Sequence, residues 1–404
     1  MNIDYRLKPR AQRLRDQLHP NADLPFGSIP SDHIFLMDYA NGTWGNARIV
    51  PDGSLEAGGI PLSMTAIALG YAQSVFEGAK AFRHPDGEVY LFRFDENANR
   101  MNRSADRMCL PQIPLDLQLE AAHALVDVDR LWLPEREGHS LYLRPQLFGT
   151  ESSAAVRSSV SHTFGITLFP SGPYFPGGFG RMISLWITDQ FHRAVPGGTG
   201  GIKASANYGP CLYPQRLAKE RYGCAQVLYL DVTNTFIEEA GAMNHYHVTA
   251  DGAVVIPTFT DTILPSITAR SVLELLAEGR IPGLRGDQRH IPINEFIAHV
   301  RRGKITEAGG FGTAAVVAPV EDYALFDCGD RLPVQQKAGP QSKAIYDLLT
   351  GIQSGIQEPP LGWLQKVERR ETQRAMSRGL SVTGKKELAH IITPGWRAGG
   401  EGLG

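Results

Sequence analysis

The stretch GGTGGIKASANYGP, residues 197–210, places one lysine, Lys203, within a glycine-rich segment. A lysine in such a loop is often a solvated surface side chain. A phosphate-binding loop does not fit, because Ile202 separates the last glycine from the lysine and Ala204 replaces the required hydroxyl. A third possibility is a Schiff-base lysine, since a bare backbone would let a flat cofactor ring approach. Companion residues elsewhere must decide between these uses.

The composition indicates a soluble globular protein whose expected partner is a small molecule or another protein. Its 404 residues suffice for two domains that share an interface. The 40 Lys and Arg residues nearly balance 42 Asp and Glu residues, so the charge favours neither nucleic acid nor an anionic membrane as a partner. The four cysteines are widely spaced, which predicts no metal site and a reducing cytoplasm. No apolar window is long enough to span a membrane.

A segment rich in proline and glycine, residues 169–180, divides the chain into two parts. Before it, a strand over 88–92 leads into a helix from about residue 95, whose apolar stripe comprises Phe94, Ala98, Met101, Ala105 and Met108. After it, the pattern predicts strands over 182–190, 225–232 and 253–258 and helices over 268–279 and 293–303. We therefore expect a smaller N-terminal α/β domain (1–168), an interdomain loop (169–180), a larger C-terminal domain (181–364) and a partly helical, partly mobile extension (365–404).

A series of blocks between about Phe26 and Trp363 resembles one family in both sequence and order. The blocks are DHIFLMDY, YAQSVFEGAKAFR, NRMNRSADRM, LYLRP, PGGTGGIKASANY, EEAGAMN, ILPSIT and FGTAAVVAP. They resemble the branched-chain amino acid aminotransferases, which are class IV enzymes of pyridoxal-phosphate fold type IV. The resemblance implies an α/β (α+β) fold of the D-amino-acid-aminotransferase type, with the active site between two mixed domains. It also implies pyridoxal 5'-phosphate as cofactor and a homodimer whose partner subunit completes each site.

The resemblance assigns cofactor roles to residues of these blocks. Lys203 would form the Schiff base and move the substrate's proton, Glu239 would lie beside the pyridine nitrogen, and Tyr208 would bind the ring oxygen. The phosphate would be bound by Arg100, the amides of Ile267 and Thr268, and the turn of Gly312 and Thr313. One observation independently suits an anion, because a helix beginning near Thr268 presents free N–H groups. Glu238, the neighbour of Glu239, is expected to be exposed.

The resemblance also assigns a substrate pocket. Tyr142 and Arg144 would accept both an apolar side chain and the γ-carboxylate of the second substrate, since arginine suits a bidentate grip on a carboxylate. Arg144 in a structural ion pair is the alternative. Amides around Ala314 and Ala315 would hold the α-carboxylate. The other candidates are Tyr71 and Phe76 as an apolar wall, and Ala154, Val156, Tyr174 and Ala242.

Departures from the family pattern gather near the expected side-chain pocket. They are Pro30 in place of an aromatic residue, Gln146 in place of an apolar one, Ser153 and Ala154 in a loop that usually carries bulkier residues, Ser266 in place of glycine, and His245 and His247 on a normally apolar strand. Neutral drift is one interpretation, and for the histidines it would place both rings toward solvent. A change of specificity is the other.

Two interpretations of the enzyme's activity therefore stay open. One moves the amino group of an aliphatic, branched-chain L-amino acid to 2-oxoglutarate by a ping-pong mechanism. The other is a specialised biosynthetic transaminase for a bulkier or more polar amino acid. A lyase or D-amino acid transaminase fits the blocks less well, and a non-catalytic protein of this fold would be expected to lose Lys203 or Glu239.

Overall fold

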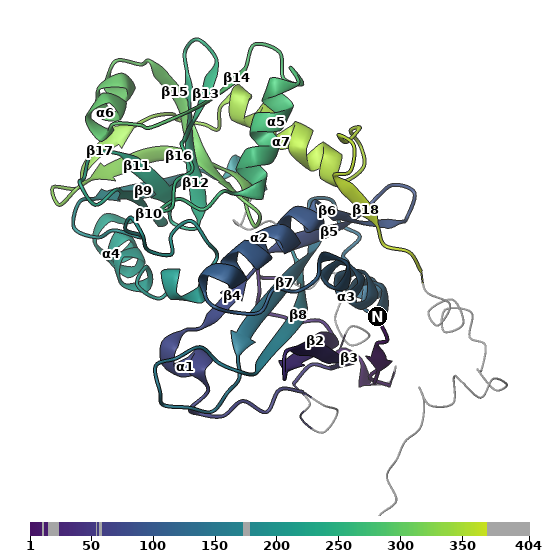
Figure 1. The fold of residues 1–404 in the computed structure, drawn as a ribbon. Helices are drawn as coiled ribbons and strands as arrows, with labels where there is room; N and C mark the ends of the chain where they lie inside the picture. The colour runs from purple at the N-terminus through teal and green to yellow at the C-terminus, as the bar shows by residue number, and fades with distance from the viewer. Residues whose placement is uncertain (10–11, 15–23, 54, 56–58, 173–177, 370–404) are drawn as a thin grey trace, which may run out of the picture.

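The computed structural model describes residues 1–9, 12–14, 24–53, 55, 59–172 and 178–369. Tyr174, predicted to line the pocket, and most of the C-terminal extension lie outside these residues. Within the described residues, no helix is both long and apolar enough to cross a bilayer. Two nine-stranded sheets organise the molecule, one in the lower and one in the upper half of Figure 1.

The first sheet is almost entirely antiparallel. Its strands are β1 (Asp4–Tyr5), β2 (His33–Ala40), β3 (Thr43–Pro51), β4 (Ser74–Phe76), β5 (Ala79–Arg83), β6 (Val89–Phe92), β7 (Ser140–Gly149), β8 (His162–Ser171) and β18 (Leu364–Lys366). They follow the order β1-β3-β2-β8-β7-β5-β6-β18, with β4 also paired to β7. Only β1 and β3 run parallel. Because β18 pairs with β6, the chain returns to the first sheet after building the second.

Helix α2 (Phe94–Arg107) lies along the boundary between the two halves, as Figure 1 shows. Its predicted apolar stripe is confirmed, since Phe94 and Met101 are buried in the core of the first sheet together with residues of α3 (Leu115–Val128). The opposite, polar edge of α2 contacts the second half of the chain. There Arg93 donates to Glu274 and Arg100 donates to the carbonyl of Pro265. This half also contains α1 (Ile67–Tyr71) and the 3₁₀ turn Arg130–Trp132.

The second sheet is mixed. Its strands are β9 (Ile183–Thr188), β10 (Gln226–Leu230), β11 (Ile237–Ala240), β12 (Met243–Thr249), β13 (Ala253–Pro257), β14 (Arg285–Arg289), β15 (Ile305–Gly312), β16 (Val316–Leu325) and β17 (Asp330–Pro333). The order is β11-β10-β9-β16-β15-β12-β13-β14, with β17 on β16. Because β11 also pairs with β12, the strands from β11 to β12 close on themselves. Strand β9 runs parallel to both of its neighbours.

Helices cover both faces of this second sheet. They are α4 (Leu212–Tyr222), α5 (Ile267–Ala277), α6 (Ile293–Arg301) and α7 (Pro340–Gln353), with 3₁₀ turns at Gly178–Gly180 and Ser205–Asn207. The cluster that contains Val272 of α5 and Leu349 of α7 is distinct from the cluster that contains Phe296 of α6. The strands predicted over 182–190, 225–232 and 253–258 correspond to β9, β10 and β13, and the predicted helices correspond to α5 and α6. The domain boundaries stay a prediction, and β8 occupies the first residues of the predicted loop.

The prediction that His245 and His247 face solvent is wrong. Both rings on β12 are buried, and each packs 5.4 Å from the ring of Phe296 on α6. Alternation along a strand implies a solvent face only when one face of the sheet is open, and here α6 covers it. Glu239 pairs with Asn244, so Glu239 and His245 lie on opposite faces of the sheet. His245 is therefore no part of a pocket built around Glu239.

Burial of His245 predicts acid sensitivity. Desolvation lowers the pKa of His245 from 6.5 to about 3. Between these pH values the His245 ring binds a proton in the unfolded chain but stays neutral in the folded chain. The free energy of unfolding therefore falls as the pH falls. The loss from this ring should be on the order of 2 kcal/mol at about pH 5. We expect His245→Leu to lose less stability than the wild type between neutral pH and about pH 5, measured as urea midpoints. His290→Leu, at an exposed ring, is the control and should keep the wild-type slope.

Candidate active site

The backbone of Lys203 is fixed between the two halves of the molecule. Its N–H donates to the hydroxyl of Ser104 on α2 at 3.0 Å, and its carbonyl accepts from the N–H of Phe76 on β4 at 3.1 Å. The preceding glycines allow this approach. A Cβ on Gly200 would lie 2.6 Å from the carbonyl oxygen of Thr262, closer than real Cβ atoms come. The glycines thus allow the backbone before Lys203 to pack closely against the backbone near residue 262.

The side chain of Lys203 meets two aromatic residues. Its Nζ lies 3.2 Å from the hydroxyl of Tyr208 and 4.8 Å from the centre of the Phe76 ring. The rings of Phe76 and Tyr208 contact each other edge to face at 4.9 Å. Lys203 is half-buried, so its amine is partly desolvated, as an amine nucleophile requires. The solvated surface lysine considered from the sequence does not fit these contacts.

Arg100 is buried on α2 and held by Glu77, a residue that the sequence analysis did not single out. Nε and Nη2 of Arg100 donate to the two carboxylate oxygens of Glu77 at 2.7 and 2.8 Å. Asn97 also donates to Glu77 at 2.8 Å. Burial opposes ionisation of Glu77, but the charge and hydrogen bonds of Arg100 outweigh it and lower the pKa of the carboxyl group. The signal in the sequence was a lone acidic residue within the apolar run SVFEGA.

The remaining guanidinium nitrogen of Arg100 points to the start of α5. Nη1 donates to the carbonyl of Pro265 at 3.0 Å. The next residue, Ser266, caps the helix, since its hydroxyl accepts from the N–H of Ala269 at 3.2 Å. Ile267 and Thr268 follow as the first helical residues, whose N–H groups have no acceptor within the helix. A cation and a helix N-terminus therefore adjoin, which suits a phosphate group. The departure at Ser266 keeps this helix start capped.

Glu239 is a buried carboxylate in the second sheet. It accepts from the N–H of Leu264 at 2.6 Å and forms an ion pair with Arg193 at 3.2 Å. Burial raises the pKa of Glu239, while the charge of Arg193 and the bond from Leu264 oppose the rise. The expectation that Glu238 is exposed is wrong: it is buried too and accepts a hydrogen bond from the hydroxyl of Thr262. Successive residues point to opposite faces, and both faces of β11 are covered.

Tyr142 and Arg144 share one face of β7, beside Phe76. The guanidinium of Arg144 lies 4.7 Å from the centre of the Phe76 ring and donates to the hydroxyl of Tyr142 at 3.0 Å. Among the described residues it has no carboxylate partner, so the alternative of a structural ion pair is not supported. Phe26 packs edge to face on Tyr142 at 4.8 Å. Cross-strand from Phe76, Gln146 is exposed on the same face.

The turn of Thr313, Ala314 and Ala315 joins β15 to β16 and is half-buried. Beside it, a Cβ on Gly312 would lie 3.7 Å from the carbonyl oxygen of Ala242, so the two turns lie together. By contrast, no hydrogen bond, ion pair or ring contact within the described part of the chain joins Tyr71, Ala154 or Val156 to Lys203. The hydroxyl of Tyr71 donates to the carbonyl of Ala154 at 2.5 Å, and Val156 is 84% exposed.

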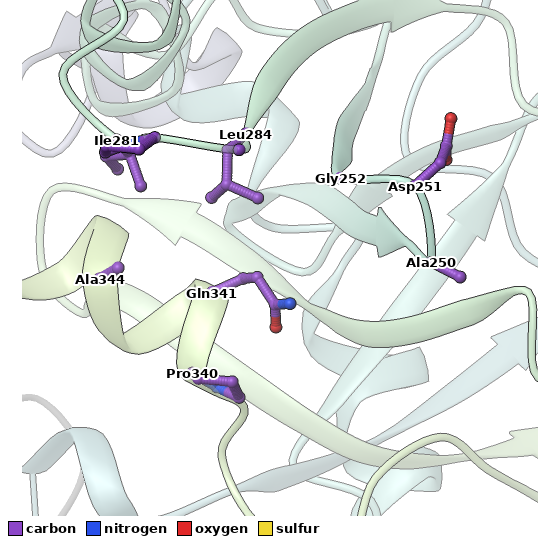
Figure 2. A pocket seen from close by; sticks show the side chains of 10 residues that line it. Ala250, Asp251, Gly252, Ile281, Leu284, Pro340, Gln341 and Ala344 are labelled. Atoms are coloured by element: carbon purple, nitrogen blue, oxygen red, sulfur yellow. The ribbon is translucent and has the colours of Figure 1, made fainter.

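Figure 2 shows a separate pocket, of about 470 Å³, that contains none of the predicted site residues. It lies between the β12–β13 turn, the loop after α5 and the first turn of α7. The N-terminus of α7 already has an anion, because Glu307 accepts from the N–H groups of Gln341 at 3.0 Å and Ser342 at 2.7 Å. The lining residues are Ala250, Asp251, Gly252, Ile281, Pro282, Gly283, Leu284, Pro340, Gln341 and Ala344.

Comparison with protein families matches residues 74–322 to the amino-transferase class IV family. The chain belongs to the class IV aminotransferases. It is 38% identical over 352 residues to the branched-chain-amino-acid aminotransferase of Mycobacterium tuberculosis (strain ATCC 25618 / H37Rv), covering 85% of this chain and 92% of the relative. It is 39% identical over 349 residues to branched-chain-amino-acid transaminase 1 of Bacillus subtilis (strain 168), covering 86% and 95%. The non-catalytic alternative is therefore not supported.

Solved structures agree with the fold. A branched-chain amino acid aminotransferase of Escherichia coli is similar to this chain with a TM-score of 0.65 and 26% identity, covering 83% of this chain and 99% of that one. Class IV aminotransferases depend on pyridoxal 5'-phosphate. The described residues fit this cofactor, because the charge of Lys203 acts on both Glu239 and Glu77, the partner of Arg100, and Arg100 reaches the carbonyl that precedes the free N–H groups of α5. Among these residues, no cluster of ligands suits a metal ion.

Glu77 should control cofactor affinity in this aminotransferase. Glu77→Gln removes the charge that orients Arg100, so we expect the Kd for pyridoxal 5'-phosphate to rise about tenfold. The measurement is a titration of the apoenzyme followed by cofactor absorbance. Glu96→Gln is the matched control, since Glu96, one turn before Arg100 on the same helix, is more exposed and pairs with Arg270. An unchanged Kd in Glu77→Gln would show that the pair serves folding alone.

Proposed function

We propose that the protein transfers the amino group of an aliphatic, branched-chain L-amino acid such as leucine, isoleucine or valine to 2-oxoglutarate by a ping-pong mechanism. The observation that carries this proposal is the position of Arg144. Its guanidinium lies against the ring of Phe76, which also contacts the amine of Lys203, and has no described carboxylate partner. One pocket thus offers an apolar wall for a branched side chain and a cation for a second carboxylate. The names of the relatives support the same substrates.

Each cofactor role rests on a group whose surroundings suit it. Arg100 and the N–H groups of Ile267, Thr268 and the Gly312–Thr313 turn would bind the phosphate. Glu239 would hold a proton at the pyridine nitrogen, and the hydroxyl of Tyr208 would bind the ring oxygen. Pyridoxal phosphate, when bound, supplies a ring that withdraws electrons from the substrate's Cα. The amine of Lys203 would take the proton from Cα and return it, as general base and then general acid.

The substrate's two ends would be bound by different elements. Backbone N–H groups around Ala314 and Ala315 would hold the α-carboxylate, which every substrate carries. Phe76 and Tyr142 would contact the aliphatic side chain, and Arg144 would bind the γ-carboxylate of glutamate or 2-oxoglutarate. A specialised transaminase for a more polar amino acid is the second candidate. The exposed amide of Gln146, cross-strand from Phe76, favours it.

A homodimer is supported by an exposed apolar surface, which we name the α1 patch. Its residues lie on the segment 62–71, which includes α1, and on the loop that follows β7, and two hydroxyl groups, of Thr65 and Ser152, join these segments at 2.6 Å. Exposed apolar side chains on joined segments are typical of an interaction site. In the proposed dimer, the loop with Ser153 and Ala154 would complete the partner's pocket. The residues of the α1 patch are Leu62, Met64, Leu69, Tyr71, Val156 and Val160.

A cytoplasmic location stays a proposal from the cysteines. Cys109, Cys211, Cys224 and Cys328 all carry free thiols. Free thiols are typical of proteins in a reducing compartment.

Lys203 gives the sharpest test of the activity. Lys203→Ala should lower transamination by at least about a thousandfold, because the proton at Cα loses its carrier. The measurement adds single L- and D-amino acids to the holoenzyme and follows cofactor absorbance during the half-reaction. Response to leucine, isoleucine and valine would support the first candidate, and response only to polar amino acids the second. Lys219→Ala, at an exposed lysine, is the control. Normal turnover in Lys203→Ala would contradict the proposed role.

The α1 patch gives a test of the dimer. Leu69→Glu places a charge within it, and we expect the native mass in solution to fall from dimer to monomer, because an unpaired charge is costly to bury. Sedimentation equilibrium measures this directly. Leu361→Glu introduces the same charge at a fully exposed leucine outside the patch and should leave the mass unchanged. If Leu69→Glu forms a dimer with the same dissociation constant as the wild type, the interface lies elsewhere.

A further inference from the structure

Lys80 is a buried cation that the proposed mechanism does not use. It lies on β5 directly opposite Tyr142 of β7, so its side chain shares the face that carries Tyr142 and Arg144. The residue is only 8% exposed. None of the ion pairs among the described residues includes it. A buried lysine without a carboxylate is unusual, because burial of an unpaired charge is costly.

The amine of Lys80 connects the first sheet to the turn of the second. Its Nζ donates to the carbonyl oxygen of Ala314 at 2.9 Å, across 234 positions of sequence. The peptide that joins Ala314 to Ala315 is planar and trans, so its C=O and N–H point in opposite directions. By fixing the carbonyl of Ala314 on one side, Lys80 directs the N–H of Ala315 to the other side. A positive charge on the carbonyl also polarises the peptide and strengthens that N–H as a donor.

We propose that Lys80 is a positioning residue that aims the N–H of Ala315 at the substrate's α-carboxylate and strengthens its hold. This inference rests on the proposed function, in which the Ala314–Ala315 turn binds that carboxylate. Lys80 would act on every substrate alike, because all carry the α-carboxylate, whereas Arg144 would act only on substrates with a second one.

The charge of Lys80 is sensitive to pH in the working range. Desolvation lowers the pKa of Lys80 to about 8. Tyr142 and Arg144 are the ionisable groups that share its face from β7, and the Thr313–Ala315 turn contributes none. Because the protonated amine is the form that polarises Ala314, carboxylate binding should weaken as the pH rises through about 8.

The experiment measures binding of a carboxylate without turnover. The probe is 4-methylvalerate, which has the carbon skeleton of leucine without its amine, and 4-methylpentan-1-ol is the matched neutral probe. Both are titrated into the holoenzyme and followed by cofactor absorbance. We expect Lys80→Met to raise the Kd of 4-methylvalerate about tenfold or more. The Kd of the alcohol should stay within about twofold of the wild-type value. Lys80→Arg, which keeps the charge and donors, should restore most of the affinity. Lys219→Met is the control for loss of a lysine.

Several results would overturn the inference. Unchanged binding of 4-methylvalerate in Lys80→Met would do so, as would equal weakening of the acid and the alcohol, which indicates packing alone. Lys80→Gln replaces the methionine variant if that chain is not recovered, with the same expectations. The pH dependence of 4-methylvalerate binding near pH 8 should disappear in Lys80→Met. If it persists, another group causes it and the inference is wrong. Transamination by the wild type tests the proposed function separately, so a failure of Lys80 alone leaves that function standing.

Discussion

The buried pair of Arg100 and Glu77 is the interaction on which the site depends. Glu77 lies between β4 and β5 of the first sheet, Arg100 lies on α2, and the free end of Arg100 reaches the carbonyl before α5 of the second sheet. Removal of one partner from a buried pair costs roughly 3–5 kcal/mol, because the other charge stays without compensation. This pair therefore connects the two halves where the phosphate site is expected. The same helix holds the backbone of Lys203 through Ser104, one turn after Arg100.

Helix α2 explains why a charged helix can lie in the interior. Its apolar stripe packs on the first sheet, and its polar edge faces the second half through Arg93, Glu96, Arg100 and Ser104. These positions recur every three or four residues, so one edge of the helix supplies all of them. A sequence pattern that is typical of a solvated helix face is here the interface between two sheets. Each buried charge on this edge is matched by a partner from another segment.

The sequence could predict features that depend on local spacing, but not those that depend on a partner distant in sequence. Lys203 with Tyr208, the stripe of α2 and the start of α5 follow from spacings of a few residues, and the family blocks set the fold. Glu77, Arg193 and Lys80 were missed, because each acts through a residue distant in sequence. Glu238 and His245 were placed wrongly for a related reason. Alternation along a strand shows which residues share a face, but only the layers show whether a face meets solvent.

The distribution of charge across the site separates two functions. On the cofactor side, Arg100 has Glu77 and Arg193 has Glu239, so each buried cation is neutralised within the chain. On the face of β5 and β7, Lys80 and Arg144 have no described carboxylate, although Lys80 is buried and Arg144 is half-buried. Apart from Lys203, the described cations of the site that lack a carboxylate therefore lie on the face where substrates would bind. A branched-chain amino acid would bring one carboxylate to this face, and glutamate or 2-oxoglutarate would bring two.

The aromatic rings of Phe76 and Tyr142 lie against the guanidinium of Arg144. A branched apolar side chain could therefore cover Arg144 without bringing a charge to it. In the proposed function, an uncompensated cation with an aromatic cover would allow one pocket to alternate between the two kinds of substrate.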